Sequence, residues 1–128
     1  MPRNLKIALD PKAMVNGCWV IIYEDEGYAD TSLLVTGPAS FSDLRGLPNS
    51  NGKDWGDDID SIVVGPNCWL QVFADEGFQD TTAWYGPNSQ LPGLGDMGDE
   101  IDSMILHEVP TAEYFDFLRR INKLNAAK

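Results

Sequence analysis

The sequence predicts an all-β protein, a Greek-key β-sandwich of two similar motifs with an amphipathic helix added at the C-terminus. The first observation is an internal repeat: residues 17–31 read GCWVIIYEDEGYADT, and residues 67–81 read NCWLQVFADEGFQDT. The second is that side chains in both copies alternate between two faces, as in strands with differently buried sides. Because one motif alone would leave a sheet face uncovered, we expect the two motifs to pack together.

The repeat sets the expected domain boundaries. We expect an N-terminal extension at residues 1–16, one domain at residues 17–108 and a C-terminal helix at residues 109–128. Within the domain, motif one covers residues 17–65 and motif two covers residues 66–108. Each motif should hold about four short strands. Besides the repeated strands, we expect strands at residues 32–36, 61–64, 82–85 and 103–107, separated by the turn sequences GP, LPNSNG and LPGLG.

Residues 111–128 have a helical pattern instead. Apolar side chains recur there at helical spacing, at Tyr114, Phe117, Leu118, Ile121 and Leu124. Thr111 can cap the start of this helix, and basic residues fall toward its end, where they complement the helix dipole. We expect the helix to pack against its own domain, which gives a monomer, with a homodimer through this helix as the alternative. A membrane role is disfavoured for so acidic a chain.

Composition narrows the classes of partner and the compartment. The net charge of −11, from 20 acidic and 9 basic residues, disfavours nucleic acid and anionic membranes and favours cations. The N-terminal sequence has no long apolar run, so neither a signal peptide nor a membrane span is predicted. Cys18 and Cys68 are too few for a disulfide framework, and we expect two free thiols buried in the core. A cytoplasmic protein is therefore expected, although a mature secreted chain would look the same.

Two acidic segments also repeat. GDDIDSIVV begins at Gly56 and GDEIDSMIL begins at Gly98, and each places three carboxylates within four residues. Like charges at this spacing repel by up to about 1 kcal/mol each even in water. Either a bound cation offsets this repulsion, or the segments are solvated turns.

These residues carry a resemblance to a known family. Two aromatic residues five positions apart, followed later by two Asn/Asp, two variable residues, Ser/Thr and Ser, define the Greek-key motif of the βγ-crystallins. Tyr23 and Tyr28 match the aromatic element in motif one, and Phe73 and Phe78 match it in motif two. The two acidic segments occupy the second element. Over residues 17–108 the chain thus resembles one βγ-crystallin domain, similar to the microbial calcium-binding members.

The chain departs from this family pattern at three positions in each motif. Asp30 and Asp80 stand where the family has a glycine, in a backbone conformation that glycine tolerates best. Glycine in turn replaces the first Asn/Asp of the acidic element, at residues 56 and 98. Asp60 and Asp102 replace the Ser/Thr that would donate a hydroxyl oxygen to a metal ion.

The resemblance implies up to two calcium ions bound between the motifs. Calcium takes six to eight oxygen ligands, and an aspartate in place of a serine keeps an oxygen donor and adds charge. Carried over by position, the first site combines Asp60 and the carbonyl of Asp58 with the hairpin residues Ala74, through its carbonyl, and Asp75. The second site combines Asp102 and the carbonyl of Glu100 with Glu24.

Other chemistry finds little support. An EF-hand loop would require a register that is absent from NSNGKDWGDDID, and no phosphate loop, HExxH or nucleophile elbow occurs. The single histidine, His107, is expected to be an ordinary strand residue. Four tryptophans could form a sugar-binding surface, but the resemblance favours packing for them: Trp19, Trp55, Trp69 and Trp84.

We therefore expect a non-enzymatic calcium-binding protein whose ions stabilise the fold, with a role in calcium buffering, dormancy or stress tolerance. One alternative is a calcium-independent structural or interaction protein that uses the C-terminal helix to dock a partner. Another is a secreted toxin or inhibitor on the same fold.

Overall fold

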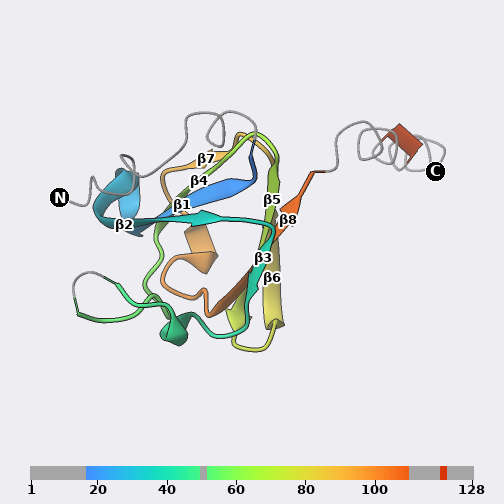
Figure 1. Cartoon of the computed structure of the whole chain (residues 1–128). Coiled ribbons are helices and arrows are strands. Elements are labelled where there is room, and N and C mark those ends of the chain that lie inside the picture. Colours follow the sequence, from blue (N-terminus) through green and yellow to red (C-terminus); the bar gives the residue numbers. More distant parts are fainter. Residues whose placement is uncertain (1–16, 50–51, 110–118, 121–128) are drawn as a thin grey trace.

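A computed structural model describes residues 17–49, 52–109 and 119–120 of the chain. Two antiparallel four-stranded sheets face each other in this part (Figure 1). The strands are β1 (Trp19–Asp25), β2 (Ala29–Thr36), β3 (Ala39–Phe41), β4 (Ser61–Val64), β5 (Cys68–Asp75), β6 (Gln79–Tyr85), β7 (Gln90–Leu91) and β8 (Ser103–Glu108). Short 3₁₀ turns are η1 (Glu26–Tyr28), η2 (Leu44–Gly46) and η3 (Gly95–Met97). The expected all-β Greek-key sandwich is confirmed.

The two motifs are interlocked through their third strands. The first sheet has the order β2-β1-β4-β7 and the second has the order β3-β8-β5-β6. The short strand β3 of motif one therefore lies in the sheet of motif two, and β7 of motif two lies in the sheet of motif one. Each sheet is completed by the other motif, so neither half has its full sheet alone.

The core follows from the alternation in the repeated strands. Val20 and Ile22 of β1 and Leu70 and Val72 of β5 are fully buried, whereas their sequence neighbours are only half-buried on the outer faces, with Phe73 the exception. Burial of each such side chain stabilises the fold by roughly 1.5–3 kcal/mol. The core thus lies between the sheets and holds β4 and β8, the strands that directly follow the acidic residues 56–60 and 98–102.

The expectation of two free cysteines is wrong. Cys18 and Cys68 are buried, as expected, but they form a disulfide with their Cα atoms 4.4 Å apart. The reason is the symmetry of the motifs: Cys18 directly precedes β1, Cys68 begins the equivalent strand β5, and the sandwich brings these strand starts together. The disulfide therefore joins motif one to motif two across the core. Disulfides of this kind persist in oxidising compartments.

The N-terminal extension and the C-terminal helix, expected at residues 109–128, lie outside the described residues, apart from Val109, Arg119 and Arg120. In the part of the chain that the structure describes, no helix has the length and apolar character needed to cross a membrane.

Candidate functional site

Each motif has one long β-hairpin, formed by β1 and β2 in motif one and by β5 and β6 in motif two. A buried serine holds each hairpin to the last strand of its own motif. Ser61 donates from Oγ to the carbonyl of Asp25 at 2.6 Å and accepts from the amide of Tyr28 at 3.0 Å. Ser103 makes the same two bonds in motif two, at 2.6 Å and 3.1 Å. Both serines are fully buried. These bonds place each hairpin against the residue that precedes the serine, which is an aspartate in both motifs.

The aromatic pairs of the hairpins are equally symmetric. The rings of Tyr23 and Tyr28 meet edge to face with centroids 5.5 Å apart, and those of Phe73 and Phe78 do so at 5.6 Å. The amide of Asp60 donates to the carbonyl of Tyr23 at 2.9 Å, next to the first pair. Asp102 donates to Phe73 at the same distance. The two acidic segments are therefore hydrogen-bonded to their hairpins in the same way.

The acidic segments of the two motifs meet each other through backbone hydrogen bonds. The amide of Asp57 donates to the carbonyl of Ile101 at 3.1 Å, and the amide of Asp99 donates to the carbonyl of Ile59 at 3.1 Å. Both isoleucines are fully buried and anchor their segments. Because of this crossing, aspartates from opposite motifs become neighbours.

One such pair consists of Asp60 and Asp99. Burial raises the pKa of Asp60, and the charge of Glu26 raises it further. Burial also raises the pKa of Asp99, followed by the charge of Asp60 and a hydrogen bond with its carboxyl group. The two carboxyl groups thus interact directly, and both are harder to ionise than free aspartate.

The symmetric pair consists of Asp102 and Asp57. Burial, the charge of Asp57 and a hydrogen bond with its carboxyl group raise the pKa of Asp102 to about 6. Arg45 acts in the opposite direction and lowers the pKa of Asp102. Within the described residues, Asp102 Oδ1 is buried without a hydrogen-bond partner. An unpartnered buried carboxylate oxygen is costly and suits a cationic ligand.

The structure relates two of the three departures from the family pattern to each other. A Cβ atom on Gly98 would lie 2.8 Å from Asp60 Oδ1, and a Cβ atom on Gly56 would lie 3.3 Å from Asp102 Oδ1. A side chain at either glycine would therefore crowd the aspartate of the other motif. The glycine in one acidic segment thus makes room for the aspartate in the other.

The third departure takes the expected conformation. Asp30 and Asp80 have φ angles of 66° and 69°, in the left-handed region. Each aspartate accepts a hydrogen bond from the following amide, at 2.9 Å and 2.8 Å. This local bond is what allows aspartate, more than most residues, to stand where glycine is favoured.

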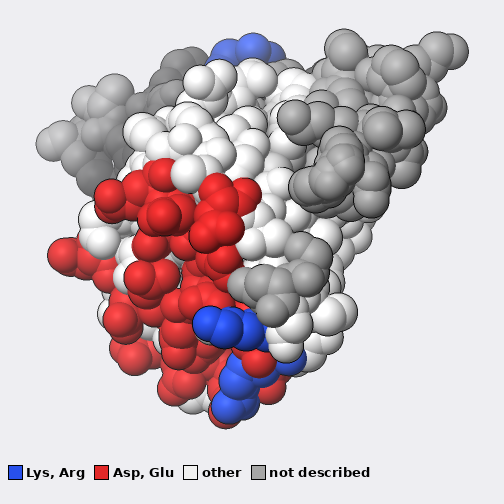
Figure 2. Space-filling model, turned by 90° about the vertical axis from the view of Figure 1, so that its left-hand side faces the viewer, with Lys and Arg blue, Asp and Glu red and all other residues white. Residues whose placement is uncertain are grey.

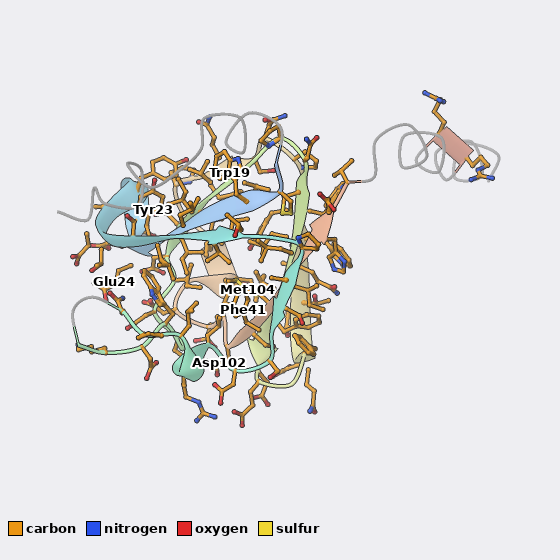
Figure 3. All side chains as sticks on the ribbon, in the orientation of Figure 1. Trp19, Tyr23, Glu24, Phe41, Asp102 and Met104 are labelled. Atoms are coloured by element: carbon orange, nitrogen blue, oxygen red, sulfur yellow. A yellow bond between two sulfur atoms is a disulfide. The ribbon has the colours of Figure 1, made fainter. Side chains whose placement is uncertain are left out.

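The hairpin residues predicted as ligands lie in different surroundings. The charge of Asp75 raises the pKa of Asp102, and Asp75 is not among the main influences on the pKa of Asp60, the residue with which it was expected to share a site. Ala74 directly precedes Asp75 on β5. Glu24 accepts from Thr31 Oγ1 at 3.0 Å and from Asn49 Nδ2 at 3.2 Å. Figure 3 shows Glu24 and Asp102 at separate places on the molecule.

The remaining predicted ligands, Asp58 and Glu100, lie inside the acidic segments. The amide of Asp58 donates to the carbonyl of Trp55 at 3.3 Å, and that of Glu100 donates to Met97 at 3.1 Å. Four acidic residues that act on the pairs were not among the ligands predicted from the sequence: Asp25, Glu26, Asp57 and Asp99. For the last two, the repeated second Asn/Asp of the family pattern was an available signal.

Acidic side chains gather on one face of the molecule, the left-hand side of Figure 1, with few basic atoms at its lower margin (Figure 2). Among residues 17–49, 52–109 and 119–120, however, no three His, Cys, Asp or Glu side chains are arranged closely enough to hold a metal ion by themselves. Each of the two pairs, Asp60–Asp99 and Asp102–Asp57, supplies only two carboxylates, so a bound ion would need backbone carbonyls or water as further ligands.

The tryptophans do not share one surface. Trp55 is buried, Trp19 covers Gly65 in the first sheet and Trp69 covers Gly86 in the second. Trp84 is half exposed and stacks on His107, with ring centroids 5.1 Å apart. His107 also contacts Gln71 Oε1 through Nε2 at 3.1 Å, and burial lowers its pKa.

Comparison with solved structures finds the same fold. A domain solved in work on the evolution of the eye lens βγ-crystallin fold has a TM-score of 0.63 and 28% identity, covering 72% of this chain and 87% of that one. A βγ-crystallin from Ciona intestinalis has a TM-score of 0.56 and 29% identity, with 70% and 99% covered. The described part of the chain has the fold of a βγ-crystallin domain.

A protein with the same fold was solved with nickel bound. A clostrillin double mutant in complex with nickel has a TM-score of 0.58 and 22% identity, with 70% of this chain and 98% of that chain covered. At this identity it shows the fold alone, and its two substitutions introduce histidines. No protein-family model matches the sequence, and no curated protein is significantly similar to it.

Proposed function

We propose that this βγ-crystallin domain is a non-enzymatic calcium-binding protein that holds up to two ions, one at each carboxyl pair between the motifs. The observation that carries the proposal is the pairing of Asp60 with Asp99 and of Asp102 with Asp57 across the two motifs. Two neighbouring carboxylates repel less when they share a proton or face a cation. Carboxylate and carbonyl oxygens are the ligands that calcium takes in proteins.

The residues present fit such an ion. Asp102 Oδ1 is buried without a partner among the described residues, which leaves one oxygen free for coordination. The carbonyls of Asp58 and Glu100 are the backbone ligands that the family resemblance implies. Exposed hairpin carboxylates lie near each pair, Asp25 at the first and Asp75 at the second, and water can complete the shell.

Calcium would then act on the stability of the fold. An ion that binds only the native state adds about 2.7 kcal/mol to the free energy of unfolding at a hundredfold excess over its Kd. It would also remove the repulsion between the paired carboxylates. A role in calcium buffering, dormancy or stress tolerance follows from this property and from the family resemblance.

Isothermal titration calorimetry with calcium at pH 7 tests the proposal. We expect up to two ions in the unmodified chain, and Asp60→Ala and Asp102→Ala should each remove one of them, because alanine leaves no side-chain oxygen to coordinate the ion. Asp30→Ala is the matched control, because it removes the same charge from an exposed residue outside both pairs and should leave the stoichiometry unchanged. Equal binding in all four proteins, or no binding at millimolar calcium, would reject the assignment.

A further inference from the structure

We infer that Arg45 makes the two proposed calcium sites unequal, because it acts as a built-in cation at the Asp102–Asp57 pair and, among residues 17–49, 52–109 and 119–120, has no counterpart at the Asp60–Asp99 pair. Calcium should therefore bind more weakly at the pair that Arg45 faces. This inference rests on the proposed function and concerns which of the two sites fills first.

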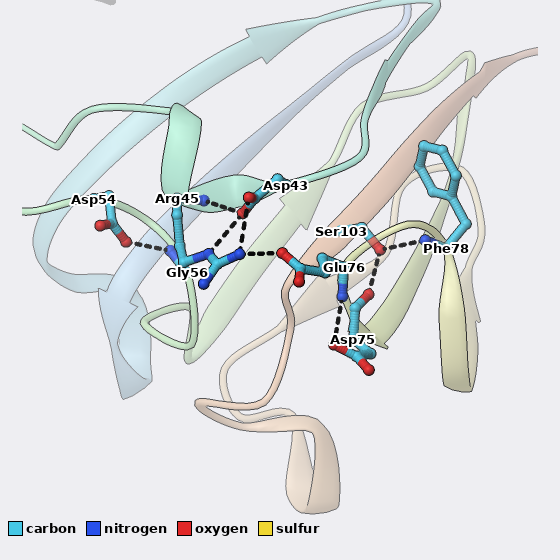
Figure 4. A network of polar contacts seen from close by, with 8 residues as sticks. All are labelled: Asp43, Arg45, Asp54, Gly56, Asp75, Glu76, Phe78 and Ser103. Carbon is cyan, nitrogen blue, oxygen red and sulfur yellow. Dashed lines mark hydrogen bonds and ion pairs between the residues drawn. The ribbon is translucent and has the colours of Figure 1, made fainter.

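Arg45 is held beside the acidic segment by a fork of hydrogen bonds (Figure 4). Its Nε donates to Asp43 Oδ1 at 2.9 Å and its Nη2 donates to Asp43 Oδ2 at 3.0 Å. The same Nη2 also contacts Glu76 of the second hairpin. The carboxylate of Asp43 additionally accepts from the amide of Arg45 at 3.0 Å, which orients the residue in η2.

The position of η2 brings this guanidinium toward Asp102. The amide of Leu44 donates to the carbonyl of Asp102 at 2.8 Å, so the residue before Arg45 is bonded directly to the acidic segment. The stem of Arg45 lies over Gly56, where a Cβ atom would be 2.6 Å from Arg45 Cγ. The charge of Arg45 accordingly opposes the other influences on Asp102.

The Asp60–Asp99 pair has a glycine at the position equivalent to Arg45. Gly27 and Gly77 are the equivalent glycines of the two hairpins, and each donates from its amide to the other motif, Gly77 to the carbonyl of Ser42 and Gly27 to the carbonyl of Pro92. Residues 42 and 92 therefore correspond. Three positions further along, Arg45 corresponds to Gly95, which has no side chain. The charges that act most on Asp60 are acidic, from Glu26 and Asp25.

The asymmetry predicts an ordered occupancy. A positive charge within several Å of a divalent ion lowers the ion's affinity by roughly tenfold near a protein surface, where water screens the interaction. The Asp60–Asp99 pair should therefore bind calcium first, and the Asp102–Asp57 pair should fill roughly tenfold higher in calcium concentration.

Each site can be measured alone. In an Asp60→Ala background only the site beside Arg45 remains, and Arg45→Gln should tighten calcium binding there by roughly tenfold. Glutamine keeps the Cγ atom that covers Gly56. In an Asp102→Ala background the same substitution should leave the affinity unchanged. Arg120→Gln is the matched control, because it removes the same charge from an exposed residue that follows the domain of residues 17–108.

Different outcomes would overturn the effect of Arg45 and the calcium binding itself. If calcium binds with the expected stoichiometry but Arg45→Gln changes neither site, or changes both as Arg120→Gln does, then Arg45 does not set the order and the inference is overturned. If no variant binds calcium, the proposed function itself fails. Arg45→Lys keeps the charge and should retain the weaker affinity, and circular dichroism of the metal-free variants verifies that each is folded.

Discussion

At the scale of single residues, the informative positions are those where this chain differs from its family. The replacement of a hydroxyl residue by Asp60 and Asp102 is visible in the sequence, and so is the glycine before each acidic run. Their connection is not visible, because the glycine of one motif lies against the aspartate of the other. Only the crossing of the two segments reveals it.

The left-handed backbone at Asp30 and Asp80 was predictable, because it depends on a local turn that the family pattern marks. The partners of Asp60 and Asp102 were not, because they come from residues about forty positions away. Asp57 and Asp99 therefore enter the candidate site from the structure, although the repeated acidic segments contain them.

The buried serines support the hairpins and give a prediction. Ser61→Ala or Ser103→Ala should each lower the free energy of unfolding by about 2–3 kcal/mol, because a buried carbonyl and a buried amide both lose their partner. Urea denaturation measures the change. Ser40→Ala is the control, since Ser40 is exposed on β3, and it should change stability by less than about 0.5 kcal/mol. An equal effect at all three serines would contradict this role.

At the scale of strands and turns, the sequence predicted two of the strands closely and two only in part. The expected strands at residues 61–64 and 103–107 correspond to β4 and β8 within one residue. Those expected at residues 32–36 and 82–85 were three residues too short, because β2 begins at Ala29 and β6 begins at Gln79. The short strands β3 and β7 were not predicted, since three and two residues are too few to show a period. These are the strands that interlock the motifs, so the exchange between sheets could not be read from the pattern.

The disulfide between the starts of β1 and β5 gives a second prediction. Closing a loop over a sequence separation of 50 residues stabilises a fold by about 4 kcal/mol in the chain-entropy description. Reduction should therefore lower the urea midpoint markedly, while a Cys18→Ser, Cys68→Ser double variant should not respond to a reducing agent. Two free thiols in the native protein, titrated without reductant, would contradict the bond.

At the scale of the whole molecule, the sequence predicted an acidic protein with a preference for cations. It did not predict that the acids would gather on one face or pair across the motifs, because both depend on how the motifs pack (Figure 2). We propose that these pairs hold protons in the absence of metal and calcium in its presence. Stability should then depend on pH in a characteristic direction.

The direction follows from the raised pKa values. The folded chain binds more protons than the unfolded chain between the ordinary pKa of aspartate, near 4, and the pKa of about 6 at Asp102. The free energy of unfolding of the metal-free protein should therefore fall as the pH rises from 4 to 7. Allowing for solvent screening, Asp102 should contribute a loss of about 1–2 kcal/mol. Asp60 and Asp99 act in the same direction.

The most direct test is the free energy of unfolding between pH 4 and pH 7.5, measured once with a chelator and once with millimolar calcium. We expect stability to fall with rising pH in the chelator and calcium to reverse the fall, so that the two curves separate above about pH 5. Two curves that coincide over the whole range would contradict the claim that the cross-motif carboxyl pairs are calcium sites.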